Sequence, residues 1–428
     1  MLINNKCCET NSNKNDCKYI DTIVIGAGQA GIATSEHLCN LRIDHIVLEK
    51  NRVAEAWRTR RWDSLVANGP CWHDKFPNMD FPHKPDTFVH HNEVAQYFED
   101  YAKMIQSPIL TGVEVVKITK NLKRKGFTVQ TTGGKFIANY IVVATGPFQT
   151  PVIPSIAPKE MGLYQIHSDQ YKNPKQLPEG SVLVVGSGSS GVQIASELNS
   201  FGKKVYLSVG PHERPPRSYR GRDNVWWLGV LDTWQESKPP QRPIKGFAVS
   251  GMNGGQTVDF RKMGHEGITL LGMTSKFENG KAYFKNDLVE NIINAEKSYL
   301  DTLEIMDKYV ESNGLDLPQD PNAKILSEMP VSMLDPLLEL DFKETNINSI
   351  VWASGFGFDY DWLPFNIFNE NGAPIHNKGI TNEHGFYFVG LPYLSGKGSS
   401  FIWGVWHDAK RIAEYIDIQH QYENYESV

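Results

Sequence analysis

Two segments of the chain share one pattern of apolar and polar positions. Each begins with a run of β-branched and other apolar residues, passes through a glycine-rich loop, continues with apolar residues at helical spacing, and ends in a second apolar run. The first covers residues 19–49 and the second covers residues 181–208. A strand–loop–helix–strand unit of about 30 residues requires parallel strands. The pattern therefore predicts an α/β fold with two Rossmann-like dinucleotide-binding domains.

The rest of the chain shows further helical and extended patterns. An amphipathic helix is expected at 91–105, where apolar residues recur on one helical face, and three strands are expected between residues 113 and 143. A long helix is expected at 287–312 and a final helix at 399–416. The sequence shows no short-period repeat, and its one internal repeat is the pair of glycine-loop units.

Composition and charge narrow the class of protein. The 428 residues exceed one ordinary core, so two or three domains are expected. A net charge of −6 argues against a nucleic-acid-binding surface. The sequence contains no run of about 18 apolar residues, so no membrane span is predicted. Residues 1–18 are rich in Asn and Lys, so we expect a flexible N-terminal tail, no signal peptide and a cytoplasmic location.

Cysteines and histidines give no sign of a metal site or a redox dithiol. The chain holds five cysteines and no Cys-x-x-Cys, so neither a zinc knuckle nor a disulfide-exchanging pair is indicated. His90 and His91 lack ligand spacing to a carboxylate or a thiol. We therefore expect reduced thiols and no bound metal.

Each glycine loop has the G-x-G-x-x-G spacing in the context that nucleotide binding requires. The first glycine permits a tight turn, the second lets the backbone approach a pyrophosphate, and the third lets the helix pack closely on the strand. The helix N-terminus then offers free N–H groups to the phosphates. A turn without a ligand is the alternative for one loop, and the presence of two argues against it. The residues expected to bind the nucleotides are Gly26, Gly28, Gln29, Ala30, Gly31, Gly186, Gly188, Ser189, Ser190 and Gly191.

The end of the second strand differs between the two units. The first unit ends at Glu49, followed by Lys50, and a carboxylate there accepts hydrogen bonds from ribose hydroxyls, which suits the adenosine of FAD. The second unit ends at Ser208, and Arg214 and Arg217 follow. A hydroxyl and two guanidinium groups suit the 2′-phosphate of NADPH, which we therefore favour over NADH. The alternative is that both arginines are solvated loop residues.

Two further strand ends match each other. Thr145-Gly146 and Ser354-Gly355 each follow an apolar strand that ends in Ala. Such turns let the chain pass close to a bound nucleotide or cross between domains. All four residues are therefore candidates for cofactor binding, with simple strand termination as the alternative.

With these motifs in place, the chain resembles the class B flavin-dependent monooxygenases, the family of flavin-containing, Baeyer–Villiger and YUCCA-type enzymes, and within it a bacterial branch. The resemblance covers residues 19–416. It implies an NADPH domain inserted into an FAD domain, which agrees with the order of the two loops. We therefore expect a tail at 1–18, an FAD-binding domain at 19–165 plus 335–428, and an NADPH-binding domain at 166–334.

The family fingerprint F-x-G-x-x-x-H-x-x-x-Y/F/W falls at residues 161–171. His167 and Tyr171 match it, whereas Met161 replaces the Phe and Leu163 replaces the Gly. The final Tyr resembles the heteroatom-oxygenating branch, and the two departures leave the reaction subtype open. The resemblance implies that His167 helps to couple the two domains, so it is a candidate catalytic residue. A structural histidine is the alternative.

Three more residues carry over from the resemblance. Trp57 falls where the family places a Trp near the flavin. Asn68 falls where flavin-containing monooxygenases place an active-site Asn, whose amide can hydrogen-bond flavin-bound oxygen or the nicotinamide; a turn Asn before Gly-Pro is the alternative. Ser399 opens the closing helix, whose N-terminus this fold points at the flavin pyrimidine.

The function implied by the resemblance is that of an FAD-dependent, NADPH-consuming monooxygenase. NADPH reduces FAD, the reduced flavin forms a C4a-(hydro)peroxide with O2, and one oxygen atom passes to a small organic substrate by N- or S-oxygenation or by Baeyer–Villiger oxidation. The expected partners are that substrate and O2, with neither nucleic acid nor membrane, and a homodimer is left open. Two alternatives stay open: a pyridine-nucleotide flavin reductase or oxidase without oxygen insertion, and a nucleotide-sensing regulatory flavoprotein.

Overall fold

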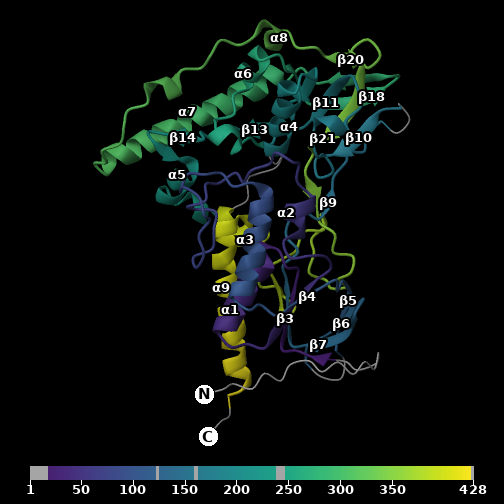
Figure 1. Ribbon diagram of the computed structural model, residues 1–428, viewed down its shortest axis with the longest axis vertical. Helices are drawn as coiled ribbons and strands as arrows, with labels where there is room; N and C mark the ends of the chain where they lie inside the picture. The colour runs from purple at the N-terminus through teal and green to yellow at the C-terminus, as the bar shows by residue number, and fades with distance from the viewer. Residues whose placement is uncertain (1–17, 122–124, 159–161, 238–245, 426–428) are drawn as a thin grey trace.

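The protein contains two α/β units stacked along its long axis, as Figure 1 shows for the computed structural model. The structure describes residues 18–121, 125–158, 162–237 and 246–425. The lower unit in Figure 1 carries helices α1 (Gln29–Asn40), α3 (His91–Met104) and α9 (Ile402–Glu423), and the upper unit carries α4 (Ser189–Ser200), α6 (Phe260–His265) and α7 (Leu288–Ser312). The predicted fold class is confirmed. Of the expected tail only Lys18 is described, in strand β1 (Lys18–Tyr19).

A five-stranded parallel sheet forms the centre of the lower unit. Its strands, in spatial order, are β23 (Phe386–Phe388), β8 (Tyr140–Val143), β2 (Thr22–Ile25), β3 (His45–Glu49) and β4 (Ile109–Thr111). Side chains alternate between its two faces. Val24 packs on the side of α1, α3 and α9, whereas Ile23 and Ile25 face a smaller sheet. That smaller sheet consists of β1, β7 (Gly134–Ala138), β6 (Phe127–Thr131) and β5 (Val115–Lys120).

The upper unit repeats this layer order around its own parallel sheet. The strands, in spatial order, are β10 (Tyr164–His167), β21 (Ile347–Trp352), β11 (Ser181–Val185), β12 (Val205–Ser208) and β17 (Thr269–Leu271). Val184 packs on the side of α4, α6 and α7, whereas Leu183 and Val185 face a second sheet. The strands of that sheet are β18 (Thr274–Glu278), β19 (Lys281–Phe284) and β20 (Glu339–Asp341).

Two chain crossings join the units, and they pair with each other. β9 (Thr150–Pro151) lies on the way from the lower to the upper unit, and β22 (Phe356–Gly357) lies on the way back. The two form a short antiparallel ribbon at the waist of the molecule (Figure 1). The upper unit is therefore inserted into the lower one, with both crossings at one place.

The boundaries of the inserted unit differ from those expected. Residues from 335 onward are expected in the FAD domain, but β20 and β21 lie in the sheets of the upper unit. β10 also begins at Tyr164, before the expected boundary at 166. The inserted unit therefore runs from Tyr164 to Trp352. An apolar run such as 347–352 suits the interior of any parallel sheet, so its pattern does not say which of two sheets receives it.

The expected helices are present, and some expected strands are divided. Helices α3 and α7 lie close to the bounds predicted for them, and the final helix is preceded by a separate 3-10 turn, η5 (Lys397–Ser400). The strand expected to end at residue 143 is two strands, β7 and β8, in different sheets. The remaining elements are α2 (Glu55–Thr59), η1 (Pro174–Gln176), β13 (His212–Glu213), β14 (Ser218–Tyr219), β15 (Arg222–Asp223), α5 (Asn224–Val230), η2 (Thr233–Gln235), β16 (Gly246–Phe247), η3 (Met252–Gly254), η4 (Pro321–Lys324) and α8 (Val331–Leu334).

A buried histidine in the lower unit makes the stability of the protein depend on pH. His45 on β3 places Nδ1 2.9 Å from the Ile43 carbonyl oxygen and Nε2 2.8 Å from Ser35 Oγ, an arrangement that suits the neutral ring. Desolvation by burial lowers the pKa of His45 below its usual 6.5. Below pH 6.5 the unfolded chain binds a proton at His45 that the folded protein does not bind. The contribution of His45 to the free energy of unfolding is therefore full above pH 6.5 and falls as the pH drops.

We predict that His45→Asn, whose amide can still donate to Ile43, makes unfolding less dependent on pH. His45 contributes up to about 1.4 kcal/mol per pH unit below 6.5 to the fall in the free energy of unfolding. Urea unfolding at several pH values between 7 and 5 measures the slope for both proteins. Equal slopes would contradict the assignment.

Candidate active site

The first glycine loop joins β2 to α1 and leaves an open anion-binding face. Gly26 adopts φ +103°, and a Cβ on Gly31 would lie 1.8 Å from the Gly26 carbonyl oxygen, so neither position accepts another residue without strain. Gly28 is the N-cap of α1, no side chain caps the helix, and a Cβ on Gly28 would meet nothing within 4 Å. The first-turn amides of Gln29 and Ala30 therefore remain available to a pyrophosphate.

Glu49 lies beside this loop in an oriented position. Its Oε2 accepts from the Ala27 amide at 2.8 Å, and its Oε1 accepts from the Asn51 amide at 2.8 Å. Two backbone donors hold the carboxylate at the carboxyl end of β3 and leave lone pairs for ribose hydroxyls. Lys50 is different, because its Nζ lies 3.9 Å from Glu114 in an exposed ion pair. The residues of the first loop and Glu49 thus fit the adenosine diphosphate part of FAD, whereas Lys50 is engaged away from the loop.

The second glycine loop, between β11 and α4, has the same geometry. Gly186 adopts φ +117°, and a Cβ on Gly191 would again lie 1.8 Å from the Gly186 carbonyl oxygen. Gly188 is the N-cap of α4, again without a side-chain cap, and Ser190 is half-buried. This helix terminus therefore also fits a pyrophosphate.

One side of the second loop, unlike the first, is covered by the chain itself. We call residues 246–249 the strap. A Cβ on Gly246 would lie 3.1 Å from the Gly188 amide nitrogen. Ser189 Oγ donates to the Phe247 carbonyl oxygen at 2.6 Å and accepts from the Val249 amide at 3.3 Å. The Ser189 hydroxyl is therefore already engaged, and a nucleotide that uses it must displace the strap.

The residues expected to hold a 2′-phosphate are engaged inside the upper unit. Ser208 is buried, donates to the Gly272 carbonyl oxygen and accepts from the Thr274 amide, each at 3.0 Å. The Arg214 side chain is 6% exposed, pairs with Asp259 at 3.0 Å, and lies 4.8 Å from the centre of the Tyr299 ring. The structure therefore gives no support for the 2′-phosphate role of Ser208 and Arg214, which stays a prediction. Sequence spacing shows the type of residue after a strand but not whether the fold buries it.

Arg217 is also buried, and it supports Asn68. Its guanidinium group pairs with Asp223, stacks 5.0 Å from the centre of the Phe88 ring, and donates through Nη1 to the Asn68 carbonyl oxygen. As for Arg214, these contacts give no support for its predicted contact with a 2′-phosphate. Asn68 itself is half-buried, and its Oδ1 accepts a hydrogen bond from Gln193 Nε2 on α4 at 3.1 Å. Asn68 is thus held between the two units.

The two matched turns lie behind the two glycine loops. A Cβ on Gly26 would lie 2.8 Å from the carbonyl oxygen of Ala144, and one on Gly186 would lie 2.4 Å from that of Ala353. These alanines precede Thr145-Gly146 and Ser354-Gly355. Thr145 Oγ1 accepts from Gln149 at 3.0 Å, and Ser354 Oγ donates to the Val152 carbonyl oxygen at 2.5 Å. Both hydroxyls therefore fasten the crossings between the units, close to the loops.

His167 fastens the same crossings. The side chain is 1% exposed, with Nε2 2.9 Å from the Gly355 carbonyl oxygen and Nδ1 3.0 Å from Asp169. The ring also packs edge-on against Phe356 in β22. A histidine with both nitrogens engaged and no exposed face cannot reach a substrate, so its candidate catalytic role is not supported. Its contacts suit a residue that couples the units.

The rest of the fingerprint is also structural where it is described. Tyr171 is fully buried, and its hydroxyl donates to Glu197 at 2.6 Å. Desolvation by burial raises the pKa of Tyr171 far above its usual range. Leu163 packs against the core of the upper unit, and Met161 lies outside the described residues.

Trp57, Gln29 and the start of α9 meet near the first loop. Gln29 Nε2 donates to the Ser400 carbonyl oxygen at 2.8 Å, and Trp57 Nε1 lies 3.4 Å from Gln29 Oε1. Trp57 packs against the cores of both units. Ser399 does not cap α9, which begins at Ile402; its Oγ accepts from the amides of Ser395 and Gly396 and closes the preceding turn.

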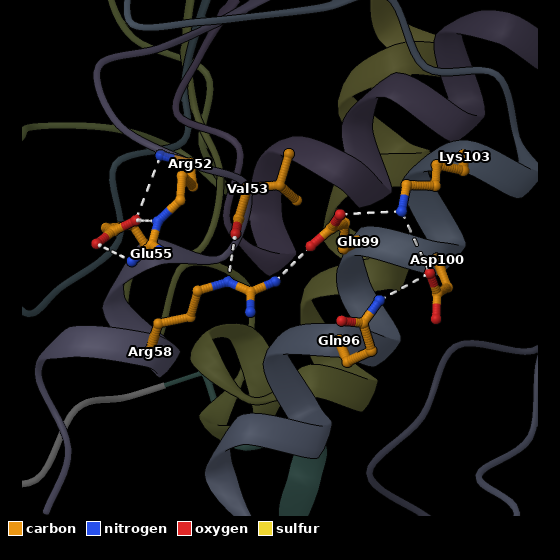
Figure 2. A network of polar contacts seen from close by, with 8 residues as sticks. All are labelled: Arg52, Val53, Glu55, Arg58, Gln96, Glu99, Asp100 and Lys103. Atoms are coloured by element: carbon orange, nitrogen blue, oxygen red, sulfur yellow. Dashed lines mark hydrogen bonds and ion pairs between the residues drawn. The ribbon is translucent and has the colours of Figure 1, made fainter.

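Helix α2, which carries Trp57, is held by α3. Figure 2 shows Arg58 on α2 between the Val53 carbonyl oxygen and Glu99 on α3. Glu99 also pairs with Lys103 at 2.9 Å, and Arg52 pairs with Glu55 at the start of α2 (Figure 2). A five-residue helix is unstable by itself, so these contacts keep Trp57 in place.

Two negative findings apply to the described part of the chain. None of its helices is long and apolar enough to cross a membrane. No group of three or more His, Cys, Asp or Glu side chains within the described ranges could hold a metal ion.

Known proteins resemble this chain over most of its length. A model of the pyridine nucleotide-disulphide oxidoreductase family matches residues 23–222. An uncharacterized CzcO-like oxidoreductase from Geobacillus kaustophilus (strain HTA426) is 33% identical, over 93% of this chain and 98% of the relative. The probable indole-3-pyruvate monooxygenase YUCCA4 of Arabidopsis thaliana is 24% identical, over 93% and 90% of the two chains.

A solved structure shares the two-unit fold. The flavin-containing monooxygenase from Stenotrophomonas maltophilia superposes with a TM-score of 0.66 at 16% identity, and the match covers 94% of this chain and 99% of that one. The match agrees with the insertion of one α/β unit into the other.

We predict that Arg214→Met lowers stability without changing nucleotide preference. Removal of the guanidinium group leaves Asp259 without its ion-pair partner and lowers the free energy of unfolding by about 2 kcal/mol. The KM values for NADPH and NADH should change by the same factor. The exposed Arg222→Met is the control and should change stability by less than about 0.5 kcal/mol. A rise in the KM for NADPH alone in Arg214→Met would support contact between Arg214 and the 2′-phosphate.

Proposed function

The chain belongs to the class B flavin-dependent monooxygenase family, and we propose that it inserts one oxygen atom from O2 into a small organic substrate. It is an NAD(P)H-dependent flavin enzyme with FAD and NADPH as cofactors. The candidate reactions are N- or S-oxygenation of a nucleophile and Baeyer–Villiger oxidation of a ketone. The observation that carries the proposal is the pair of equivalent glycine loops, one on each unit, with Asn68 held between the units by Gln193 and Arg217.

The residues of the lower unit divide the work of holding FAD. The first-turn amides of α1 would bind the pyrophosphate, and the oriented carboxylate of Glu49 would bind the ribose. Gln29 and Trp57 link this loop to the start of α9, whose N-terminus carries no side-chain cap and favours negative charge nearby. Bound FAD, reduced by the pyridine nucleotide, supplies the electrons that activate O2.

The residues at the interface of the units prepare the site for oxygen transfer. The carboxamide of Asn68 has its Oδ1 engaged and its Nδ2 without a protein partner among the described residues, so it can donate to a bound group. His167 and the paired crossings hold the units in register.

The second candidate is a flavin reductase that inserts no oxygen, a class suggested by the match to the pyridine nucleotide-disulphide oxidoreductase family. A reductase of that kind works through a reactive cysteine pair. Cys39 and Cys71, the cysteines that the structure describes, are free. Desolvation by burial raises the pKa of the Cys71 thiol and so lowers its thiolate fraction. These observations favour the monooxygenase.

We predict that the purified yellow protein couples NADPH oxidation to oxygen insertion. A tertiary amine, a thioether and a cyclic ketone serve as test compounds under 18O2, with NADPH, H2O2 and labelled product measured together. At least one compound should acquire a single 18O atom per NADPH oxidised. Asn68→Ala should lower product formation by roughly tenfold, the effect of losing about 1.4 kcal/mol of hydrogen bonding.

Other results would favour the alternatives. Recovery of all reducing equivalents as H2O2 with every compound would contradict oxygen insertion. Consumption of NADPH at the same rate without O2 in the presence of a disulfide would point to the reductase.

A further inference from the structure

Gln193 connects three parts of the molecule through one buried amide. It lies on α4, directly after the second glycine loop, and is 3% exposed. Its Nε2 donates to the Val249 carbonyl oxygen of the strap at 2.9 Å and to Asn68 Oδ1, in the other unit, at 3.1 Å. Both N–H groups of the amide are therefore used on acceptors that belong to different segments.

The orientation of the Gln193 amide follows from these two bonds. Its Oε1 is buried and has no hydrogen-bond partner. A reversed amide would turn Oε1 toward the Val249 carbonyl and Asn68 Oδ1, two acceptors, and would lose both bonds. An unpaired buried carbonyl is costly, so the two donor bonds must outweigh it for this orientation to persist.

Gln193 in turn determines which end of the Asn68 carboxamide is free. The Asn68 main chain is held by Arg217, so the residue cannot shift as a whole. A rotation of the carboxamide by half a turn would set Asn68 Nδ2 against Gln193 Nε2, two donors without an acceptor between them. Only the orientation with Oδ1 toward Gln193 is stable, and Nδ2 is then directed away from α4 and available to a ligand.

We propose that Gln193 is a positioning residue that holds the Asn68 carboxamide with its N–H groups available for the bound flavin and nicotinamide. This inference rests on the proposed function only for what Nδ2 contacts. The same helix offers its N-terminus to the pyridine nucleotide and its Gln193 side chain to Asn68, so the nucleotide loop and the Asn68 amide are positioned by one rigid element. Gln193 acts through Asn68 and touches neither the substrate nor the reacting atoms.

The proposal is tested with a double-mutant cycle in the FAD-loaded, full-length protein. Gln193→Met keeps the length of the side chain and removes both donors. Asn68→Asp keeps an acceptor for Gln193 and removes the Nδ2 donors. We measure the product formed per NADPH, the dissociation constant of NADP⁺ from the flavin absorbance, and the Tm. Each single variant should lower the product per NADPH by roughly fivefold, as expected for the loss of one hydrogen bond. The double variant should give no less product per NADPH than the more impaired of the two single variants.

The controls separate positioning from a general effect on α4. Asn199 on the same helix also donates an amide N–H to a carbonyl oxygen, that of Glu266 at 3.0 Å, but within the upper unit. Asn199→Ala should leave the product yield and the NADP⁺ affinity unchanged. If Gln193→Met does not retain FAD, Gln193→Glu keeps size and polarity while its carboxylate accepts from Asn68 Nδ2. It should then reproduce the loss of yield seen with Asn68→Asp.

The outcomes distinguish this inference from the proposed function. Multiplying effects of Gln193→Met and Asn68→Asp, or wild-type values for Gln193→Met in all three measurements, would overturn the positioning role. A wild-type protein that forms no oxygenated product would overturn the proposed function alone. The cycle is then read from the NADP⁺ dissociation constant and the Tm, where non-additive effects still support the Gln193–Asn68 link and additive effects contradict it.

Discussion

The rest of the structure depends on one constraint. In each unit, the helix after the glycine loop lies very close to the strand before that loop. In each unit the third glycine of the loop stands so near the first that an added Cβ would lie 1.8 Å from a carbonyl oxygen. The same first glycine also lies close to the carbonyl oxygen of the Ala that ends the neighbouring strand. Because no side chain fits at these points, each helix begins directly above the sheet and its N-terminal amides face outward. The same local packing leaves a helix N-terminus without a side-chain cap in each unit.

The contacts between the two units determine how the two proposed nucleotide sites are placed relative to each other. The crossing strands β9 and β22 pair at the waist, and His167 binds the carbonyl of Gly355 beside them. Asn68 is fixed from the upper unit at two points, by Arg217 and by Gln193. These residues hold the units together, and of them only Asn68 is proposed to contact a bound group. They determine how a nucleotide on one unit meets a nucleotide on the other, which is where proximity and exclusion of water contribute to rate.

Local sequence rules predicted the parts of this arrangement that depend on neighbouring residues. The glycine loops and the carboxylate of Glu49 were predictable because spacing along one strand–helix unit sets their geometry. The burial of the arginines after β12 was not predictable, because distant segments around Asp259 and Phe88 decide what these side chains contact. Strand β21 was placed in the wrong unit because apolar strands do not encode their partner sheet. Gln193 carried no local signal, since its acceptors lie far away in the sequence.

The central claim, that each unit carries its own nucleotide site, is tested most directly by separating the two sites. Gly31→Ala and Gly191→Ala make the same clash in different units, and the flavin content and anaerobic reduction by NADPH report on each site. We predict that Gly31→Ala is purified without FAD. Gly191→Ala should keep FAD and its visible absorbance, which NADPH then fails to bleach. Retention of FAD by Gly31→Ala, or normal bleaching in Gly191→Ala, would contradict it.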